Sequence, residues 1–242
     1  MFIKTLKNRI KRESVNPTIL SFFINDYYLI RGEIYSQIKE KSKYLNGSTM
    51  DFGCGTKPYK DFFADNKEYI GVDLKLEGWE DRQKYADCFY DGKTLPFENE
   101  RFDSMLCTEV LEHVFNIEEL LAEFNRVLKV DGIALITTPF MWEEHEMPYD
   151  FARYTTPALN HLYTKHGFEI VQHHKCGNNI KVICQFSLNY IKSYLPKNKL
   201  FRQILLLPFI IYFNTFSVLM STILPGDKTM YFNNVYLLKK KS

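Results

Sequence analysis

From Ser48 onward, short apolar runs alternate with stretches in which apolar residues recur at helical spacing. Five apolar runs and two later ones, which begin at Gly167 and Tyr231, predict seven strands. Strands alternating with helices form a parallel sheet through right-handed crossovers. We therefore expect an α/β, Rossmann-like, seven-stranded and mostly parallel sheet with helices on both faces. The first five strands are expected near 48–52, 68–73, 86–90, 102–107 and 132–138, and the helices around 59–65, 117–129 and 156–166.

The pattern also predicts the organisation of the chain. Ile30, Ile34 and Ile38 recur near helical spacing, so a helix is expected from about Thr18 to Lys43. The expected parts are an N-terminal helical lead-in, a catalytic core, an apolar helical insertion that covers the substrate, and a last core strand with a basic tail. Their ranges are 1–46, 47–177, 178–226 and 227–242.

Two segments raise the question of membrane contact. Residues 1–12 place apolar side chains among five cations, which is typical of an amphipathic helix on an anionic surface or of a solvated helix. Residues 204–224 contain no charged residue, and their length suits a membrane span, a helix pair lying in one leaflet, or a buried helical cover. Pro208, Asn214 and the strand that follows argue against a span.

Composition narrows the function classes. The chain has 242 residues, 45% of them hydrophobic, and a net charge of +2, which is too small to indicate a nucleic-acid partner. Its five cysteines form no C-x-x-C pair and leave an odd count, a pattern that favours free thiols in a reducing cytosol. We expect a cytoplasmic protein with membrane contact through 1–12 and 204–224.

The strongest chemical signal is a glycine turn after the first predicted strand. Residues 50–56 read Met-Asp-Phe-Gly-Cys-Gly-Thr, and a second acid, Asp73, ends the next apolar run. Glycines permit a sharp turn and close approach to a ligand, while an acid about 20 residues onward suits ribose hydroxyls. Asp51 would repel a pyrophosphate, and Pro58 stands where a dinucleotide motif has its third glycine. S-adenosylmethionine, which carries an ammonium and a sulfonium, is therefore favoured over NAD.

Five segments in order resemble class I S-adenosylmethionine-dependent methyltransferases, over about residues 45–175. They are Asp51-Phe-Gly-Cys-Gly-Thr, Gly71-Val-Asp73, Asp91-Gly-Lys-Thr-Leu-Pro-Phe97, Phe102-Asp103 and Glu109-Val-Leu-Glu-His113. The resemblance implies S-adenosylmethionine as cofactor and S-adenosylhomocysteine as product.

The same resemblance assigns cofactor-binding roles. The turn, with Asp51, Gly53, Cys54 and Gly55, would wrap the methionine half, and Asp51 would lie near the ammonium. Asp73 would accept from both ribose hydroxyls. The remaining expected contacts are Leu74 against adenine, Asp91 and the Gly92 amide on the adenine edge, with Asp87 as the rival of Asp91, and Thr108 beside the methyl group.

Acceptor chemistry is expected after the fourth and fifth predicted strands. Glu109 and His113 are catalytic candidates, with His113 placed at a helix start. The segment lacks the motifs of enzymes that methylate nucleic-acid bases. Residues 138–155 resemble a His-Glu-x-Pro-x-Asp-Phe-x-Arg-Tyr-Thr pattern of a bacterial subgroup linked to glycan and lipid-sugar biosynthesis.

In that subgroup the segment would be a lid facing the substrate. His145 would then be the general base, and the alternative is that it orders the lid by hydrogen bonding. Trp142, Tyr149 and Arg153 are expected to contact substrate, although Arg153 and Asp150 also suit an ion pair that holds the loop. No metal site is expected, because His173 and His174 have no carboxylate or cysteine at ligand spacing.

The sequence thus predicts methyl transfer to a hydroxyl or amine of a small or lipid-linked metabolite, with a sugar or lipid-linked glycan as the favoured acceptor and no nucleic-acid partner. Two alternatives stay open at this stage. They are an NAD-dependent oxidoreductase and a non-catalytic, membrane-associated scaffold that retains the cofactor pocket.

Overall fold

The computed structural model describes residues 13, 16–75, 84–224 and 226–242. The basic segment 1–12, which the sequence marks for membrane contact, lies outside them. The chain divides into two compact units. One unit joins the described residues up to Ser36 with Lys175–Asn233, and the other joins Gln37–His174 with Asn234–Ser242.

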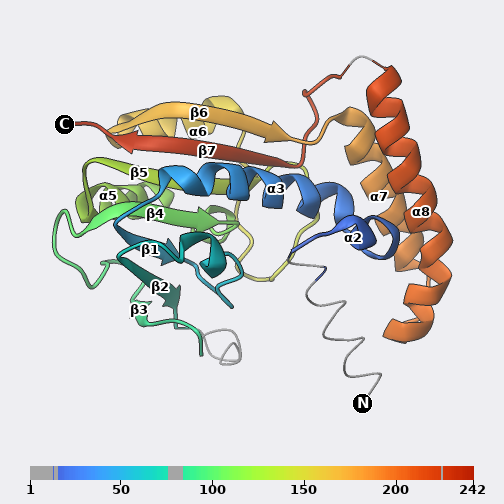
Figure 1. Ribbon diagram of the computed structural model, residues 1–242, viewed down its shortest axis with the longest axis horizontal. Coiled ribbons are helices and arrows are strands. Elements are labelled where there is room, and N and C mark those ends of the chain that lie inside the picture. Colours follow the sequence, from blue (N-terminus) through green and yellow to red (C-terminus); the bar gives the residue numbers. More distant parts are fainter. Residues whose placement is uncertain (1–12, 14–15, 76–83, 225) are drawn as a thin grey trace. The chain divides into compact units, whose positions relative to one another are not determined.

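A seven-stranded sheet organises the second unit, in the order β3-β2-β1-β4-β5-β7-β6. Strands β1 to β5 pair with one another in parallel, and Figure 1 shows the arrow of β7 opposite to that of β6. The predicted Rossmann-like sheet is confirmed. The strands are β1 Ser48–Phe52, β2 Glu68–Leu74, β3 Cys88–Tyr90, β4 Phe102–Thr108, β5 Leu128–Pro139, β6 Phe168–Cys176 and β7 Asn233–Lys240.

The helices differ from the prediction at three places. The helix expected over 117–129 is α5, Ile117–Val127, because Leu128 already pairs with Phe102 as the first residue of β5. The helix expected over 59–65 is the short 3-10 turn η2, Lys60–Phe63. Residues 156–166 form α6, Thr156–Lys165, which the Thr155 hydroxyl caps by accepting from the Ala158 amide.

The helical region expected over 18–43 is present as two helices. It is broken into α2, Ile19–Ile24, and α3, Tyr28–Lys41, with the 3-10 turn η1 over Ser42–Tyr44. Asn25 is extended at the break, and its side-chain oxygen accepts from the Tyr27 amide. An asparagine that bonds its own backbone favours a turn over a continuous helix, so the chain bends there.

The apolar face of α5 fills one side of the core. Ile117, Leu120, Leu121 and Phe124 are buried, and the Phe124 ring lies edge-on to Phe52 of β1, with ring centroids 5.0 Å apart. This packing anchors the strand that leads into the glycine turn.

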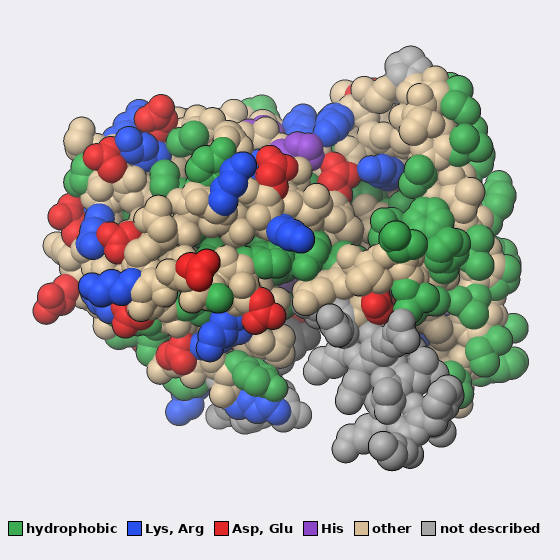
Figure 2. All heavy atoms as spheres, viewed as in Figure 1, with side chains coloured by type: hydrophobic (Ala, Val, Ile, Leu, Met, Phe, Trp, Pro, Cys, Tyr) green, Lys and Arg blue, Asp and Glu red, His purple; other side chains and the backbone are tan. Residues whose placement is uncertain are grey.

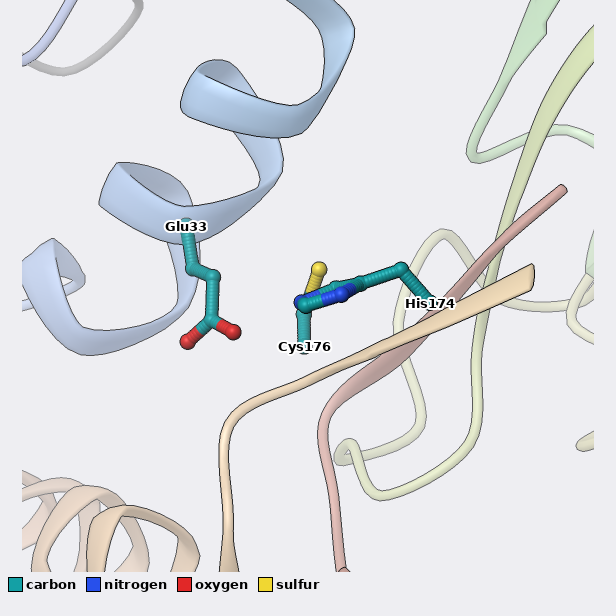
Figure 3. A group of neighbouring side chains, drawn as sticks. All are labelled: Glu33, His174 and Cys176. Atoms are coloured by element: carbon teal, nitrogen blue, oxygen red, sulfur yellow. The ribbon is translucent and has the colours of Figure 1, made fainter. Parts of the chain in front are cut away.

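The first unit is a helical assembly in which α2 packs against α8, Lys199–Ile223, and α8 against α7, Asn179–Ser193. Lys192 of α7 pairs with Asp26 and donates to the Tyr27 hydroxyl at 2.7 Å. Figure 3 shows Glu33 of α3 turned toward the C-terminal end of β6, where Cys176 lies. The Glu33 carboxylate accepts from the Gly177 amide and from Lys181, each at 3.0 Å.

Helix α8 buries two of its polar residues. Asn214 and Ser217 are buried, and the Asn214 amide donates to the Phe22 carbonyl of α2 at 2.7 Å. Ile211, Tyr212 and Leu219 are exposed, and Figure 2 shows hydrophobic side chains gathered over this helix. By length and apolar composition α8 could cross a membrane. Beside the buried Leu206 and Ile210, α8 thus buries two polar side chains and leaves large apolar ones exposed, which is unusual for a helix at a water-facing surface.

The packing of α5 predicts which phenylalanine supports the fold. Phe124→Ala removes a fully buried ring and should lower the free energy of unfolding by about 3–5 kcal/mol, measured by urea unfolding. The matched control is Phe115→Ala, which removes a ring that is 78% exposed and should cost less than about 1 kcal/mol. Equal losses for the two variants would contradict this account of the core.

Candidate functional site

The carboxyl ends of β1, β2, β3 and β4 bring the predicted cofactor residues to one edge of the sheet. Asp51 lies near the end of β1 and Asp73 near the end of β2, while Asp91 directly follows β3. Thr108 is the last residue of β4. Because parallel strands end at the same edge, residues far apart in the chain share one rim, which is where ligands bind in such sheets.

Val72 and Asp73 hold the glycine turn. The Gly53 and Cys54 amides donate to the Val72 carbonyl at 2.8 and 3.1 Å, and the Gly55 amide donates to Asp73 Oδ2 at 3.1 Å. Gly53 has φ 69°, and a Cβ on it would lie 2.2 Å from Val110 Cγ2. A Cβ on Gly55 would meet no atom within 4 Å. The turn therefore needs glycine at 53 for packing, while its backbone at Gly55 is open to a ligand.

Asp51 is a buried carboxyl without a full counter-charge. It is 2% exposed and accepts a 2.5 Å hydrogen bond from the Tyr69 hydroxyl. Burial raises the pKa of Asp51 to about 7, against the lowering effects of Tyr69 and Lys57. A cation placed beside this carboxyl would restore its charge, so the site fits the ammonium of S-adenosylmethionine and disfavours a phosphate.

Asp73 occupies the position expected for ribose. Its Oδ1 accepts from the Leu74 amide at 2.8 Å and its Oδ2 from Gly55, which fixes the carboxylate at the end of β2. The Leu74 side chain is 36% exposed beside it. An anchored two-oxygen acceptor next to an exposed apolar side chain suits a ribose and the adenine attached to it.

The two candidate adenine acids differ in their contacts. Asp87 pairs with Lys57 and accepts from the Gly71 amide at 2.7 Å, so its carboxylate is already used in contacts that stabilise the fold. Asp91 is exposed, and its Oδ1 accepts from the Lys93 and Thr94 amides at 2.8 and 2.7 Å, which lowers the pKa of this carboxyl. Gly92 has φ 90° and open space at its Cβ position. The adenine contact of Asp91 and Gly92 stays a prediction, with Asp87 now the weaker rival.

The chain turns sharply after β4. Glu109 has φ 54°, its amide donates to the Thr137 carbonyl at 3.1 Å, and its carboxylate accepts from the Thr137 hydroxyl at 2.5 Å. His113 does not stand at the start of α5. It ends the separate 3-10 turn η3, Leu111–His113, because the chain must bend back before the helix begins at Ile117.

Glu112 is a residue whose importance the sequence reading missed. Its side chain is 1% exposed, and neither carboxylate oxygen has a hydrogen-bond partner. Burial, with the nearby charge of Glu109, raises the pKa of Glu112 well above its usual range. The sequence shows Glu112 in the Glu-Val-Leu-Glu-His segment between Glu109 and His113. An acid at such a place is expected to be a solvated turn residue, and only the fold shows that it is buried.

The predicted lid is fastened to η3. The Phe151 amide donates to the Glu112 carbonyl at 2.8 Å, and His113 Nδ1 lies 2.9 Å from the Tyr149 carbonyl. The expected pairing of Asp150 with Arg153 is present as two hydrogen bonds of 2.5 and 2.7 Å, which lower the pKa of Asp150 to about 2. Arg153 thus orders the loop, and its substrate contact stays a prediction.

His145 joins this cluster from the lid. Its ring lies edge-on to that of His113, with centroids 4.9 Å apart, and its backbone amide donates to Asp150 at 2.9 Å. Tyr149 is 42% exposed and Trp142 is half-buried on the same segment. The fold therefore brings two of the catalytic candidates, His113 and His145, into contact, while the substrate roles of Trp142 and Tyr149 stay predictions.

Comparison with known proteins agrees with the cofactor edge. Residues 50–136 match the family described as a methyltransferase domain. An uncharacterised protein of Methanocaldococcus jannaschii is 30% identical over 59% of this chain and 64% of its own length. The malonyl-[acyl-carrier protein] O-methyltransferase of Legionella pneumophila is 27% identical over 45% of this chain and 43% of its own. The chain thus spans less than two thirds of the length of these relatives.

Solved structures share the fold at low sequence identity. The [4+2]-cyclase SpnF matches with a TM-score of 0.56 and 15% identity, over 87% of this chain and 82% of its own. Phosphoethanolamine N-methyltransferase 2 of Haemonchus contortus, in complex with S-adenosyl-L-methionine, matches with a TM-score of 0.54 and 14% identity, over 96% and 60%. These structures share the fold of this sheet, and the glycine turn, Asp51 and Asp73 at its edge lie within residues 50–136, the part of the chain that is similar to a methyltransferase domain.

Proposed function

We propose that the protein transfers the methyl group of S-adenosylmethionine to a hydroxyl or amine of a small or lipid-linked metabolite, with a sugar hydroxyl as the favoured acceptor. The observation that carries this proposal is the buried Asp51 carboxyl beside the glycine turn that Asp73 holds. Two proteins similar to this chain are named as an O- and an N-methyltransferase. These names support methyl transfer and leave the acceptor atom to experiment.

The bound cofactor supplies an electrophilic methyl group on a sulfonium, so the protein needs to bind, align and deprotonate. Asp51 would hold the ammonium and Asp73 the ribose hydroxyls. We assign removal of the acceptor proton to the catalytic candidates Glu109, His113 and His145, of which the two histidines are in contact and have side chains 17% and 31% exposed. The role of His145 as the sole base stays a prediction.

The other readings have less support. A buried carboxyl at the glycine turn would oppose the pyrophosphate of NAD, and the two enzymes named as methyltransferases support the first reading. A scaffold that only retains the pocket would bind cofactor without transferring a methyl group. Measurements of NAD binding, of S-adenosylmethionine binding and of methyl transfer therefore separate the three readings.

We also propose that the protein is cytoplasmic and contacts a membrane surface through α8. The support is its exposed apolar surface, since Ile211, Leu219 and Ile223 are 42%, 51% and 64% exposed while Asn214 and Ser217 are buried and hydrogen-bonded within the unit. Exposed apolar side chains along one helix are typical of a helix that lies in a membrane interface.

Asp51 predicts a pH-dependent affinity for cofactor. With a pKa of about 7 in the unliganded protein, the carboxyl is largely protonated at pH 6 and must lose that proton to pair with the ammonium. The dissociation constant of S-adenosylhomocysteine, measured by calorimetry, should therefore rise about tenfold from pH 8 to pH 6. Methylthioadenosine, which lacks the amino-acid part, is the control and should show no such change; an equal slope would refute the role of Asp51.

Asp73 predicts a loss of both binding and methyl transfer. Asp73→Asn replaces a charged acceptor, which should weaken S-adenosylhomocysteine binding by about 10- to 100-fold. Transfer of a labelled methyl group into glycan and lipid extracts should fall in parallel at limiting cofactor. Asp65→Asn, at an exposed aspartate, is the matched control. Normal cofactor binding by the wild type with no methyl transfer to any extract would support the scaffold reading instead.

Membrane contact predicts that the intact chain floats with vesicles of phosphatidylcholine and phosphatidylglycerol. Replacing Ile211, Leu219 and Ile223 together by serine should abolish flotation, because it removes apolar side chains from the exposed side of α8. The control replaces Val130 and Val171, exposed apolar residues of the other unit, by serine. Flotation that survives the first set of changes, or that is lost in the control, would show that α8 is not the contact.

A further inference from the structure

We propose that Glu112, His113 and His145 form a binding site for a divalent first-row transition-metal ion such as Zn²⁺, and that this ion holds the acceptor oxygen. One ligand atom from each of the three lies within 4.8 Å of the others. The sequence predicts no metal site; His113 and His145 are separated along the chain by α5 and β5 and meet only when it folds. The catalytic part of this inference rests on the proposed methyl transfer, whereas the binding part does not.

The separations suit an ion of this size. His113 Nε2 lies 3.7 Å from Glu112 Oε1. Ligand atoms about 2.0–2.2 Å from a tetrahedral zinc ion lie about 3.4 Å from one another, so this pair needs to close by only a few tenths of an ångström.

The Glu112 carboxylate points to a bound ligand. It is 1% exposed, its oxygens have no hydrogen-bond partner, and the only basic group within 4.0 Å of it among the described residues is the His113 imidazole. A buried carboxylate without hydrogen bonds costs free energy unless a cation compensates it. An ion at this place would give Glu112 the partner that the surrounding side chains do not provide.

Both imidazoles are oriented to offer Nε2. His113 Nδ1 faces the Tyr149 carbonyl at 2.9 Å, so it carries the hydrogen and leaves Nε2 with its lone pair. His145 Nδ1 lies 3.2 Å from both the Glu143 carbonyl and Asp150 Oδ2. Arg153 Nη2 is also near, at 3.3 Å, but its two hydrogens are directed to Glu143 and Asp150 at 2.9 and 2.7 Å.

His145 Nδ1 therefore donates, and its Nε2 is available as well. A ligating histidine that donates its other ring hydrogen to a carbonyl or carboxylate is the usual arrangement around protein-bound metals. Two imidazoles and one carboxylate favour zinc or another first-row transition metal over Mg²⁺ or Ca²⁺, which prefer oxygen ligands alone. Three protein ligands leave a coordination position open for the acceptor.

A metal ion here would deepen the proposed reaction. A hydroxyl coordinated to a divalent ion has a lowered pKa and loses its proton to solvent near neutral pH. The oxygen then forms the C–O bond as the methyl C–S bond breaks, and the sulfur keeps the electron pair. Under this proposal His113 and His145 act as ligands, and the ion takes over the activation of the acceptor.

The test is metal binding by the full-length protein after chelation and dialysis. Titration with Zn²⁺ followed by calorimetry should show about one ion per chain, and Co²⁺ should produce visible absorption bands, while Mg²⁺ should give neither result. Glu112→Gln and His113→Ala should each weaken Zn²⁺ binding by more than about 100-fold, beyond the effect usual for outer-shell residues. His161→Ala, which removes an exposed histidine of α6, is the matched control and should bind as the wild type does.

Misfolding is separated from loss of the ligand by the unliganded protein. Glu112→Gln neutralises a buried carboxyl, so its melting temperature without metal should be at least that of the wild type, whereas the rise on adding Zn²⁺ should vanish. Equal Zn²⁺ binding by Glu112→Gln and wild type would overturn the inference. Full methyl transfer by the chelated enzyme would overturn the role of the ion and leave the proposed function intact. Absence of cofactor binding alongside normal Zn²⁺ binding would overturn the proposed function and leave the metal site intact.

Discussion

A carboxyl group buried at the carboxyl end of β1 constrains the whole cofactor edge. Asp51 can be held there only because Tyr69 donates to it and because the turn that follows is closed by Val72 and Asp73 of the neighbouring strand. The turn also requires glycine at position 53, because Val110 leaves no room there for a side chain. The fold thus keeps in place a group that is unfavourable without a cation, and the cofactor ammonium is a cation of the required charge.

A second buried carboxyl, that of Glu112, repeats this logic on the acceptor side. Asp51 lies at the strand ends, whereas Glu112 lies in the turn after β4, to which the predicted lid is hydrogen-bonded through Tyr149 and Phe151. Both carboxyls have raised pKa values because burial disfavours their charged forms. Two such groups in one domain are costly to stability, and such cost is expected where residues are kept for binding or chemistry.

The helical unit shows a different compromise. In α8 the polar Asn214 and Ser217 are satisfied inside the unit, while large apolar side chains are exposed. Water would disfavour that arrangement, but a lipid surface would favour it. The inward polar residues also explain why Asn214 and the hydroxyls are weak arguments against membrane contact. Whether the exposed face of α8 suits a membrane depends on where these polar residues lie on the helix, and not on their presence alone.

The sequence alone determined the sheet, the glycine turn and the meeting of Asp51, Asp73 and Asp91 at one edge, because each depends on residues close together in the chain or on strand ends that parallel pairing aligns. It placed the end of α5 too late, because the pairing of Leu128 in β5 outweighs helical periodicity. It also did not predict the break at Asn25, which a local side-chain hydrogen bond favours. Tertiary structure decided the acceptor side. Only folding brings His145 against His113 and removes Glu112 from water, since burial and contact between distant segments leave no trace in local spacing.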